Sequence, residues 1–156
     1  MNPWIRTGLL ATALLSANAW AQVKIEQAWT RATVQGQKAT GAFMTLTANQ
    51  PLQLVAVSSP VAGVAEIHEM KMDAGVMKMR ALPALNLPAQ QAVELKPGGF
   101  HLMLMDLKAP LSKDASVALT LTFRDAKGVQ SQQQISVPVT TGMPASGAHE
   151  HGAHKH

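Results

Sequence analysis

Short runs of alternating apolar and polar residues recur along most of this chain, separated by glycine, proline, asparagine and aspartate. Alternation with a period of two predicts β-strands with one buried face. No long stretch shows apolar residues at helical spacing. The expected strands are Val23–Trp29, Gly41–Ala48, Leu52–Ser58, Ala65–Met72, Met77–Leu82, Ala92–Leu95, Phe100–Leu107, Ser116–Arg124 and Gln130–Val137. The pattern predicts a single all-β domain, either a Greek-key β-sandwich or a barrel.

The first 21 residues have the three parts of a cleaved signal peptide. Arg6 supplies the positive charge, residues 7–16 are apolar, and Ala19-Trp20-Ala21 fits the small-x-small cleavage rule. We expect cleavage after Ala21, with cleavage after Ala19 as the alternative. No later apolar run reaches the roughly 18 residues of a membrane span, so we expect a periplasmic protein without stable membrane insertion.

Composition divides the remaining chain in two. Residues 22–139 have the length and apolar content of one folded domain, whereas residues 140–156 are rich in glycine, alanine, serine and histidine. We expect residues 140–156 to be a flexible histidine-rich tail. The basic residues, 13 Lys and Arg against 9 Asp and Glu, are scattered singly. That distribution predicts no nucleic-acid partner.

The candidate chemistry is concentrated between Ile67 and Met105. Six of the 9 methionines and both histidines outside the tail lie there, in a chain without cysteine. Imidazoles and thioethers are soft, neutral ligands that suit Cu(I) and suit Mg²⁺ or Ca²⁺ poorly. The absence of cysteine excludes a blue-copper centre, which needs a thiolate ligand.

Strand alternation predicts which of these side chains share a face. In residues 100–105, Phe100, Leu102 and Leu104 form an apolar face, so His101, Met103 and Met105 share the other. His68, Met70 and Met72 share a face in the same way. Methionine in a strand is often only a core residue, and a histidine is often only structural. Here three apolar residues already supply a core face, which favours a metal site.

The turn after Met72 decides the position of Met79. A four-residue loop from Asp73 to Val76 would place Met70 opposite Met79, and Met79 would then lie on the His68 face. A three-residue loop would turn Met79 to the opposite face, since a slip of one residue inverts every side chain. The ligand hypothesis therefore requires an even-numbered loop or a bulge.

The spacing of four residues now points to a family. His68, Met79, His101 and Met103 follow the pattern H-x10-M-x21-H-x-M, which resembles the signature of the PCu(A)C periplasmic copper chaperones. Residues 28–32 (AWTRA), 41–46 (GAFMTL) and 95–110 (LKPGGFHLMLMDLKAP) resemble that family too. The resemblance covers residues 23–138 and implies a cupredoxin-like β-sandwich.

The resemblance also implies a function. His68, Met79, His101 and Met103 would bind Cu(I), and the chain would deliver it toward the CuA site of cytochrome c oxidase, directly or through a Sco-type protein. The motif assigns no role to four other methionines, which we interpret as an apolar collar or as docking points. They are Met70, Met72, Met77 and Met105.

The tail is a second candidate metal site. Its histidines are harder nitrogen ligands that suit Cu(II), Ni(II) or Zn(II). They are His149, His151, His154 and His156. Interspersed glycine and alanine distinguish this pattern from an uninterrupted affinity tag. We expect the tail, together with Met143, to capture Cu(II) and to supply the folded site after reduction.

Two other classes of function compete with a chaperone. A copper buffer without a dedicated client would need the same site, so the sequence does not separate the two. A redox or electron-transfer protein is disfavoured because the chain has no cysteine and no acid/base constellation. Glu66 and Glu69 flank His68, and we interpret both as solvated surface residues. The chain is therefore expected to be a binding protein and not an enzyme.

Overall fold

The computed structural model describes residues 22–144. The regular secondary structure within these residues consists of β-strands, without any helix. The ten strands are β1 (Val23–Arg31), β2 (Ala39–Ala48), β3 (Leu52–Ser58), β4 (Ala62–Asp73), β5 (Val76–Leu82), β6 (Leu85–Leu87), β7 (Ala92–Leu95), β8 (Phe100–Leu107), β9 (Ser116–Asp125) and β10 (Gln130–Thr140). The all-β prediction is confirmed. Residues 22–144 contain no helix with the length and apolarity of a membrane span.

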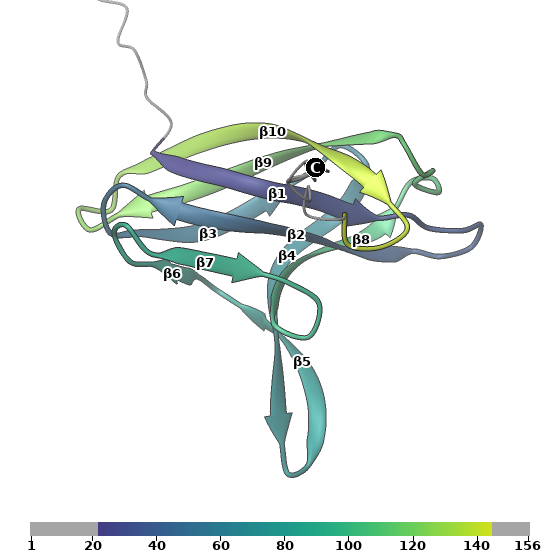
Figure 1. Ribbon diagram of the computed structural model, residues 1–156, viewed down its shortest axis with the longest axis horizontal. Helices are drawn as coiled ribbons and strands as arrows, with labels where there is room; N and C mark the ends of the chain where they lie inside the picture. The colour runs from purple at the N-terminus through teal and green to yellow at the C-terminus, as the bar shows by residue number, and fades with distance from the viewer. Residues whose placement is uncertain (1–21, 145–156) are drawn as a thin grey trace, which may run out of the picture.

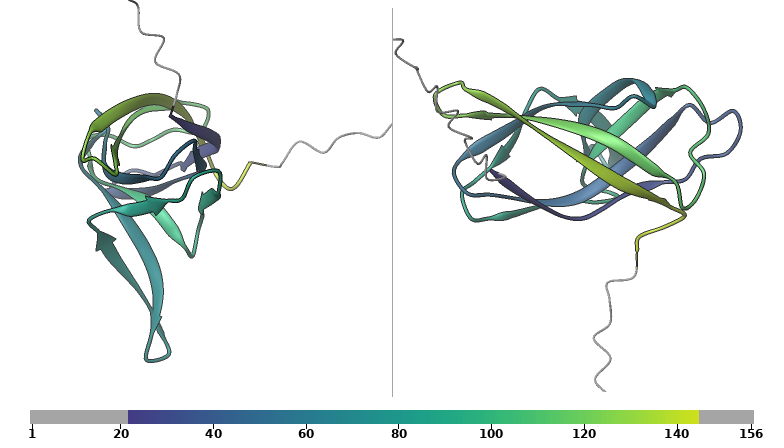
Figure 2. Two further views of the ribbon diagram at one scale, coloured as in Figure 1. Left: turned by 90° about the vertical axis from the view of Figure 1, so that its left-hand side faces the viewer. Right: turned by 90° about the horizontal axis from the view of Figure 1, so that it is seen from above.

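The strands form one continuous sheet that curls on itself around a single core (Figures 1 and 2). Their order is β5-β4-β8-β7-β2-β1-β10-β9-β3-β6, and β8 pairs with β2 as well as with β7. The parallel pairing of β1 with β10 joins the two halves, through Thr30 with Val139 and Arg31 with Thr140. Leucines and phenylalanine from both halves fill the space between them: Leu46, Leu54, Leu102, Leu104, Leu119, Leu121 and Phe123 are fully buried.

All nine expected strands are present, and a tenth was missed. β6 has only three residues and lies between Pro83 and Pro88, so local sequence gives little sign of it. β1 and β10 each run further than expected because their last residues pair with each other. Thr140, expected to begin the tail, is therefore the last residue of β10.

The hairpin of β4 and β5 has the register that the ligand hypothesis needs. Met72 pairs with Met77 and Met70 with Met79, as predicted for an even-numbered loop. The loop itself is tighter than expected, because Asp73 already pairs with Val76. Only Ala74 and Gly75 remain in the turn, both at positive φ (49° and 79°). Such a two-residue turn follows the right-handed twist of the strands.

The outer part of this hairpin projects from the body of the molecule (Figure 1). β4 pairs with β8 only as far as Glu69, which lies opposite Phe100. Among the strands of residues 22–144, β5 pairs only with β4. Residues 71–78 are therefore a two-stranded ribbon whose side chains are exposed, whereas Ile67 at the base is buried in the core.

A bulge in β1 shapes the surface beside β8. Glu26 pairs with Thr45 and Trp29 with Phe43, so β1 holds one residue more than β2 between these pairs. Gln27 takes up the extra length with φ +52°. The bulge brings the Trp29 and Phe43 rings together, with centroids 4.6 Å apart.

Candidate metal centre

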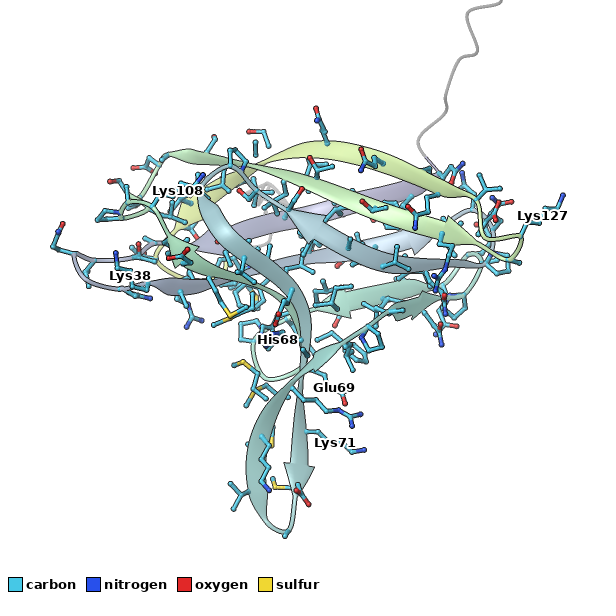
Figure 3. All side chains as sticks on the ribbon, turned by 180° about the vertical axis from the view of Figure 1, so that it is seen from behind. Lys38, His68, Glu69, Lys71, Lys108 and Lys127 are labelled. Atoms are coloured by element: carbon cyan, nitrogen blue, oxygen red, sulfur yellow. The ribbon has the colours of Figure 1, made fainter. Side chains whose placement is uncertain are left out.

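The structure brings the four predicted ligands to one face of the sheet. His68 lies on β4 directly opposite His101 on β8. Met103 lies two residues beyond His101 on the same face. Met79 on β5 lies opposite Met70, which shares the His68 face. Three neighbouring strands, β4, β5 and β8, thus supply two imidazoles and two thioethers. Figure 3 labels His68 at the base of the projecting hairpin.

Strand β8 separates this face from the core as alternation predicts. Leu102 and Leu104 are completely buried in the core, and Phe100 packs against it. Because those three residues supply the packing of β8, Met103 remains partly exposed on the opposite face. Met103 is therefore not one of the side chains that fill the core.

His101 is held in one tautomer by a backbone carbonyl. Its Nδ1–H donates to the carbonyl oxygen of Gly99 at 3.0 Å. The lone pair therefore resides on Nε2, where a metal ion could bind it. The residue is only 5% exposed, and this burial lowers its pKa below 6.5. The Gly99 bond opposes that shift of the pKa, and the nearby His68 adds a smaller lowering. Burial thus favours the neutral, ligand form of the ring.

His68 is held by a carboxylate instead. Its Nε2–H donates to Oε2 of Glu66 at 2.7 Å. Its Nδ1 is buried and makes no hydrogen bond to any described residue. A buried nitrogen without a partner is costly, and a soft metal ion would satisfy it. A carboxylate that fixes the far nitrogen of a ligating histidine is the usual outer partner in metal sites.

The expectation that Glu66 and Glu69 are merely solvated surface residues is wrong. Glu66 lies two residues before His68 and therefore on the same face, opposite Met103. Glu69 points to the other face, is largely buried, and contacts Arg80 of β5 at 2.5 Å. The spacing of two residues between Glu66 and His68 places both on one face of a strand. That spacing was the signal in the sequence for their contact.

The two imidazoles lie close together beside an aromatic wall. Their ring centroids are 5.7 Å apart in an edge-to-face arrangement. The Phe43 ring lies 6.4 Å from the His101 ring. Gly41, opposite Met103, leaves room for this ring, since a Cβ there would come within 2.7 Å of Phe43 Cζ. Gly41 and Phe43 thus shape one wall of the site.

Three of the predicted ligands line one hollow of about 330 Å³. They are Met79, His101 and Met103, and Met70 joins them. Pro97 and Gly98, from the turn between β7 and β8, border it too. Met79 is 47% exposed, so one thioether is accessible from solvent while both histidines are buried.

The other methionines divide into separate groups. Met70 borders the hollow, whereas Met72 and Met77 lie further out on the projecting hairpin and are exposed. Met105 lies on β8 between Val64 and Ala39. Hence Met72 and Met77 do not line the hollow as members of a collar.

The four tail histidines, His149, His151, His154 and His156, lie outside the described residues.

Among residues 22–144, no three histidine, aspartate or glutamate side chains gather as a metal-binding group. A metal ion held in this hollow would need the thioethers as ligands. That donor set fits Cu(I), since neutral nitrogen and sulfur ligands suit a soft ion.

Comparison with known proteins assigns the family. The model of the LpqE-like family matches residues 23–139. The chain belongs to this family. Among its relatives is Lxx21020 of Leifsonia xyli subsp. xyli, named as a lipoprotein, which is 33% identical over 82% of this chain and 74% of its own length.

The solved structures that this chain resembles include PCuAC domains, as the motif indicated. The apo PCuAC domain of PmoF1 is 26% identical, with a TM-score of 0.62 over 78% of this chain and 95% of that domain. The Cu(I) form of DR1885 from Deinococcus radiodurans is 28% identical, with a TM-score of 0.62 over 83% of this chain and 85% of that one. The assignment to the PCuAC family and the cupredoxin-like fold are confirmed.

Proposed function

We propose that this chain is a periplasmic copper chaperone, a carrier without turnover, that binds Cu(I) through His68, Met79, His101 and Met103. The observation that carries the proposal is the pairing of His68 with His101. Each ring donates one N–H to a protein acceptor, so that its other nitrogen could bind a metal ion. The Cu(I) form of a solved structure with this fold supports the choice of ion.

The two imidazoles and two thioethers account for the release of Cu(I) to a partner as well as for its binding. Thioethers favour Cu(I) over Cu(II), and neither they nor neutral imidazoles add negative charge to the site. A partner that offers thiolates can therefore replace them. Exchange would begin at Met79, which is accessible to a partner while both histidines are buried.

X-ray absorption on the Cu(I)-loaded chain tests the site. We expect two sulfur and two nitrogen neighbours. Met103→Leu should remove one sulfur, whereas Met44→Leu, a change in the buried core, should remove none. Coordination dominated by oxygen would overturn the proposal.

We further propose that the ion goes to the CuA site of cytochrome c oxidase, directly or through a Sco-type protein. Incubating the loaded chain with an apo CuA domain, and separately with an apo Sco-type protein, tests this step. Transfer to one of them is expected. If copper stays on the chain in both mixtures over hours, the chain is a copper buffer instead.

The tail proposal concerns residues outside those described. We propose that His149, His151, His154 and His156 bind Cu(II). Truncation at Ala145 should then abolish the electron paramagnetic resonance signal of bound Cu(II) and leave Cu(I) affinity intact. A loss of Cu(I) affinity in the same variant would contradict two separate sites.

A further inference from the structure

The projecting hairpin carries a row of methionines that the four-ligand site does not use. Met72 and Met77 lie opposite each other, and the pair Met70 and Met79 is the next one on the same face. Side chains directly opposite in a sheet have Cβ atoms about 5 Å apart. Successive same-face pairs are about 7 Å apart along the strand. Four thioethers thus form two adjacent rungs between the hairpin tip and the histidines.

Packing does not explain the outer rung. Met72 is 58% exposed and Met77 45% exposed. β8 does not extend along this part of the hairpin, and no other strand among residues 22–144 covers it. Methionine usually fills gaps in a core. These two side chains lie on an open face. Exposing an apolar side chain to water is unfavourable unless that side chain contacts a ligand or a partner.

The opposite face of the hairpin has a different composition. Glu69 contacts Arg80, and Asp73 contacts Lys78 at 2.8 Å. Figure 3 shows Glu69 and Lys71 on one side of the hairpin, with the yellow sulfur atoms nearest His68 on the other. One face therefore carries charged side chains, four of which form two ion pairs, and the other face carries neutral sulfur.

The turn keeps the outer rung in register. Ala74 and Gly75 alone connect the strands, so Met72 and Met77 stay opposite each other up to two residues from the tip. A two-residue turn with both residues at positive φ restricts slippage. The two sulfurs can therefore approach a common ion without rearrangement of the backbone.

We propose that Met72 and Met77, with Met70 from the next rung as a third thioether, form a second and weaker binding site for Cu(I). The inference rests on the proposed function, because the ion is the same. The site is weaker because it lacks imidazole and is open to solvent. It lies one rung from Met79, the exposed ligand of the first site.

Methyl resonances of ¹³C-labelled methionine test the inference residue by residue. Cu(I) is titrated anaerobically into the chain from Gln22 to His156, to two equivalents. We expect Met79 and Met103 to shift during the first equivalent, and Met72 and Met77 to shift mainly during the second. The tail histidines do not obscure this measurement, because each methyl group is observed separately.

The double variant Met72→Leu/Met77→Leu keeps side chains of similar size and removes both sulfurs. In it, the second phase of the Met70 shift should disappear, and the shifts of Met79 and Met103 should remain. Met105→Leu, which removes a sulfur away from the hairpin, is the matched control and should retain both phases.

The two proposals fail in distinguishable ways. If Met79 and Met103 shift but Met72 and Met77 stay unchanged to two equivalents, the second site is overturned and the first stands. Shifts of all four residues together, complete at one equivalent, also overturn a separate second site. If Met79 and Met103 do not respond at all, the proposed function itself fails.

Discussion

His68 and His101 face each other across the β4–β8 pairing, with ring centroids 5.7 Å apart, and each ring is fixed by a different acceptor. Glu66 accepts from Nε2 of His68, and the Gly99 carbonyl accepts from Nδ1 of His101. The same Gly99 oxygen accepts the backbone N–H of Met70 at 3.1 Å. The turn before β8 thus links one imidazole to the strand that carries the other.

Removing the carboxylate beside His68 should weaken copper binding without unfolding the chain. Glu66→Gln keeps the shape and loses the charge that orients the ring, and loss of such an outer partner costs about 10–100-fold in metal affinity. Competition with a Cu(I) chelator measures the change. Glu94→Gln, at a surface carboxylate paired with Lys96, is the matched control and should leave affinity unchanged. Equal affinities for the two variants would contradict the role of Glu66.

Replacing one thioether should have a larger effect. Met103→Leu preserves apolar volume but deletes a ligand, so Cu(I) affinity should fall by about 100-fold or more, above the range for an outer partner. The same competition assay measures it. Thermal unfolding of the apo form should change little, since Met103 is partly exposed and the core face of β8 is intact. An unchanged affinity would remove Met103 from the ligand set.

The apo protein should show a depressed pKa at His101. Burial disfavours the charged ring, so the folded chain protonates His101 at a lower pH than the unfolded chain does. Between the lowered pKa and about 6.5, the unfolded state binds more protons, and the free energy of unfolding should fall as pH falls through that window. Imidazole NMR measures both the pKa and the Nδ1–H tautomer. A pKa at or above 6.5, or the Nε2–H tautomer, would contradict the structure.

Crowding the aromatic wall should destabilise the site region. A Cβ at Gly41 would come within 2.7 Å of Phe43 Cζ, so Gly41→Ala should displace the ring and cost about 1–3 kcal/mol of stability. Chemical denaturation measures the cost. Gly142→Ala is the control, because a Cβ there meets nothing within 4 Å. Equal stabilities would show that the ring moves freely.

The stability of the hairpin turn should depend on how well its two residues tolerate positive φ. Ala74 adopts φ +49°, a conformation that asparagine tolerates better than alanine, so Ala74→Asn should stabilise the turn by up to about 1 kcal/mol. Gly75→Val should have the opposite effect, since a β-branched residue is strained at φ +79°. Amide hydrogen exchange at Met72 and Met77 reports both changes. Similar protection in the two variants would contradict the turn geometry.

The sequence by itself determined the secondary structure and the candidate ligands. Alternation at a period of two depends only on neighbouring residues, so it placed nine strands and assigned Leu102 to the core and Met103 to the other face. The spacing of four residues then indicated the PCuAC family. These are local signals. The structure confirmed the strands and the two faces of β8, and the comparisons confirmed the family, whereas the four ligands stay a prediction.

Only the tertiary structure decided what depends on contacts between distant segments. β6 and the last residues of β1 and β10 exist because of their long-range partners. The pairing of β4 with β8 brought His68 opposite His101, and the β1 bulge brought Trp29 onto Phe43. The end of β8 pairing at Glu69 left Met72 and Met77 on an open ribbon. No run of neighbouring residues encodes these relationships, because each requires strands that the chain brings together only on folding.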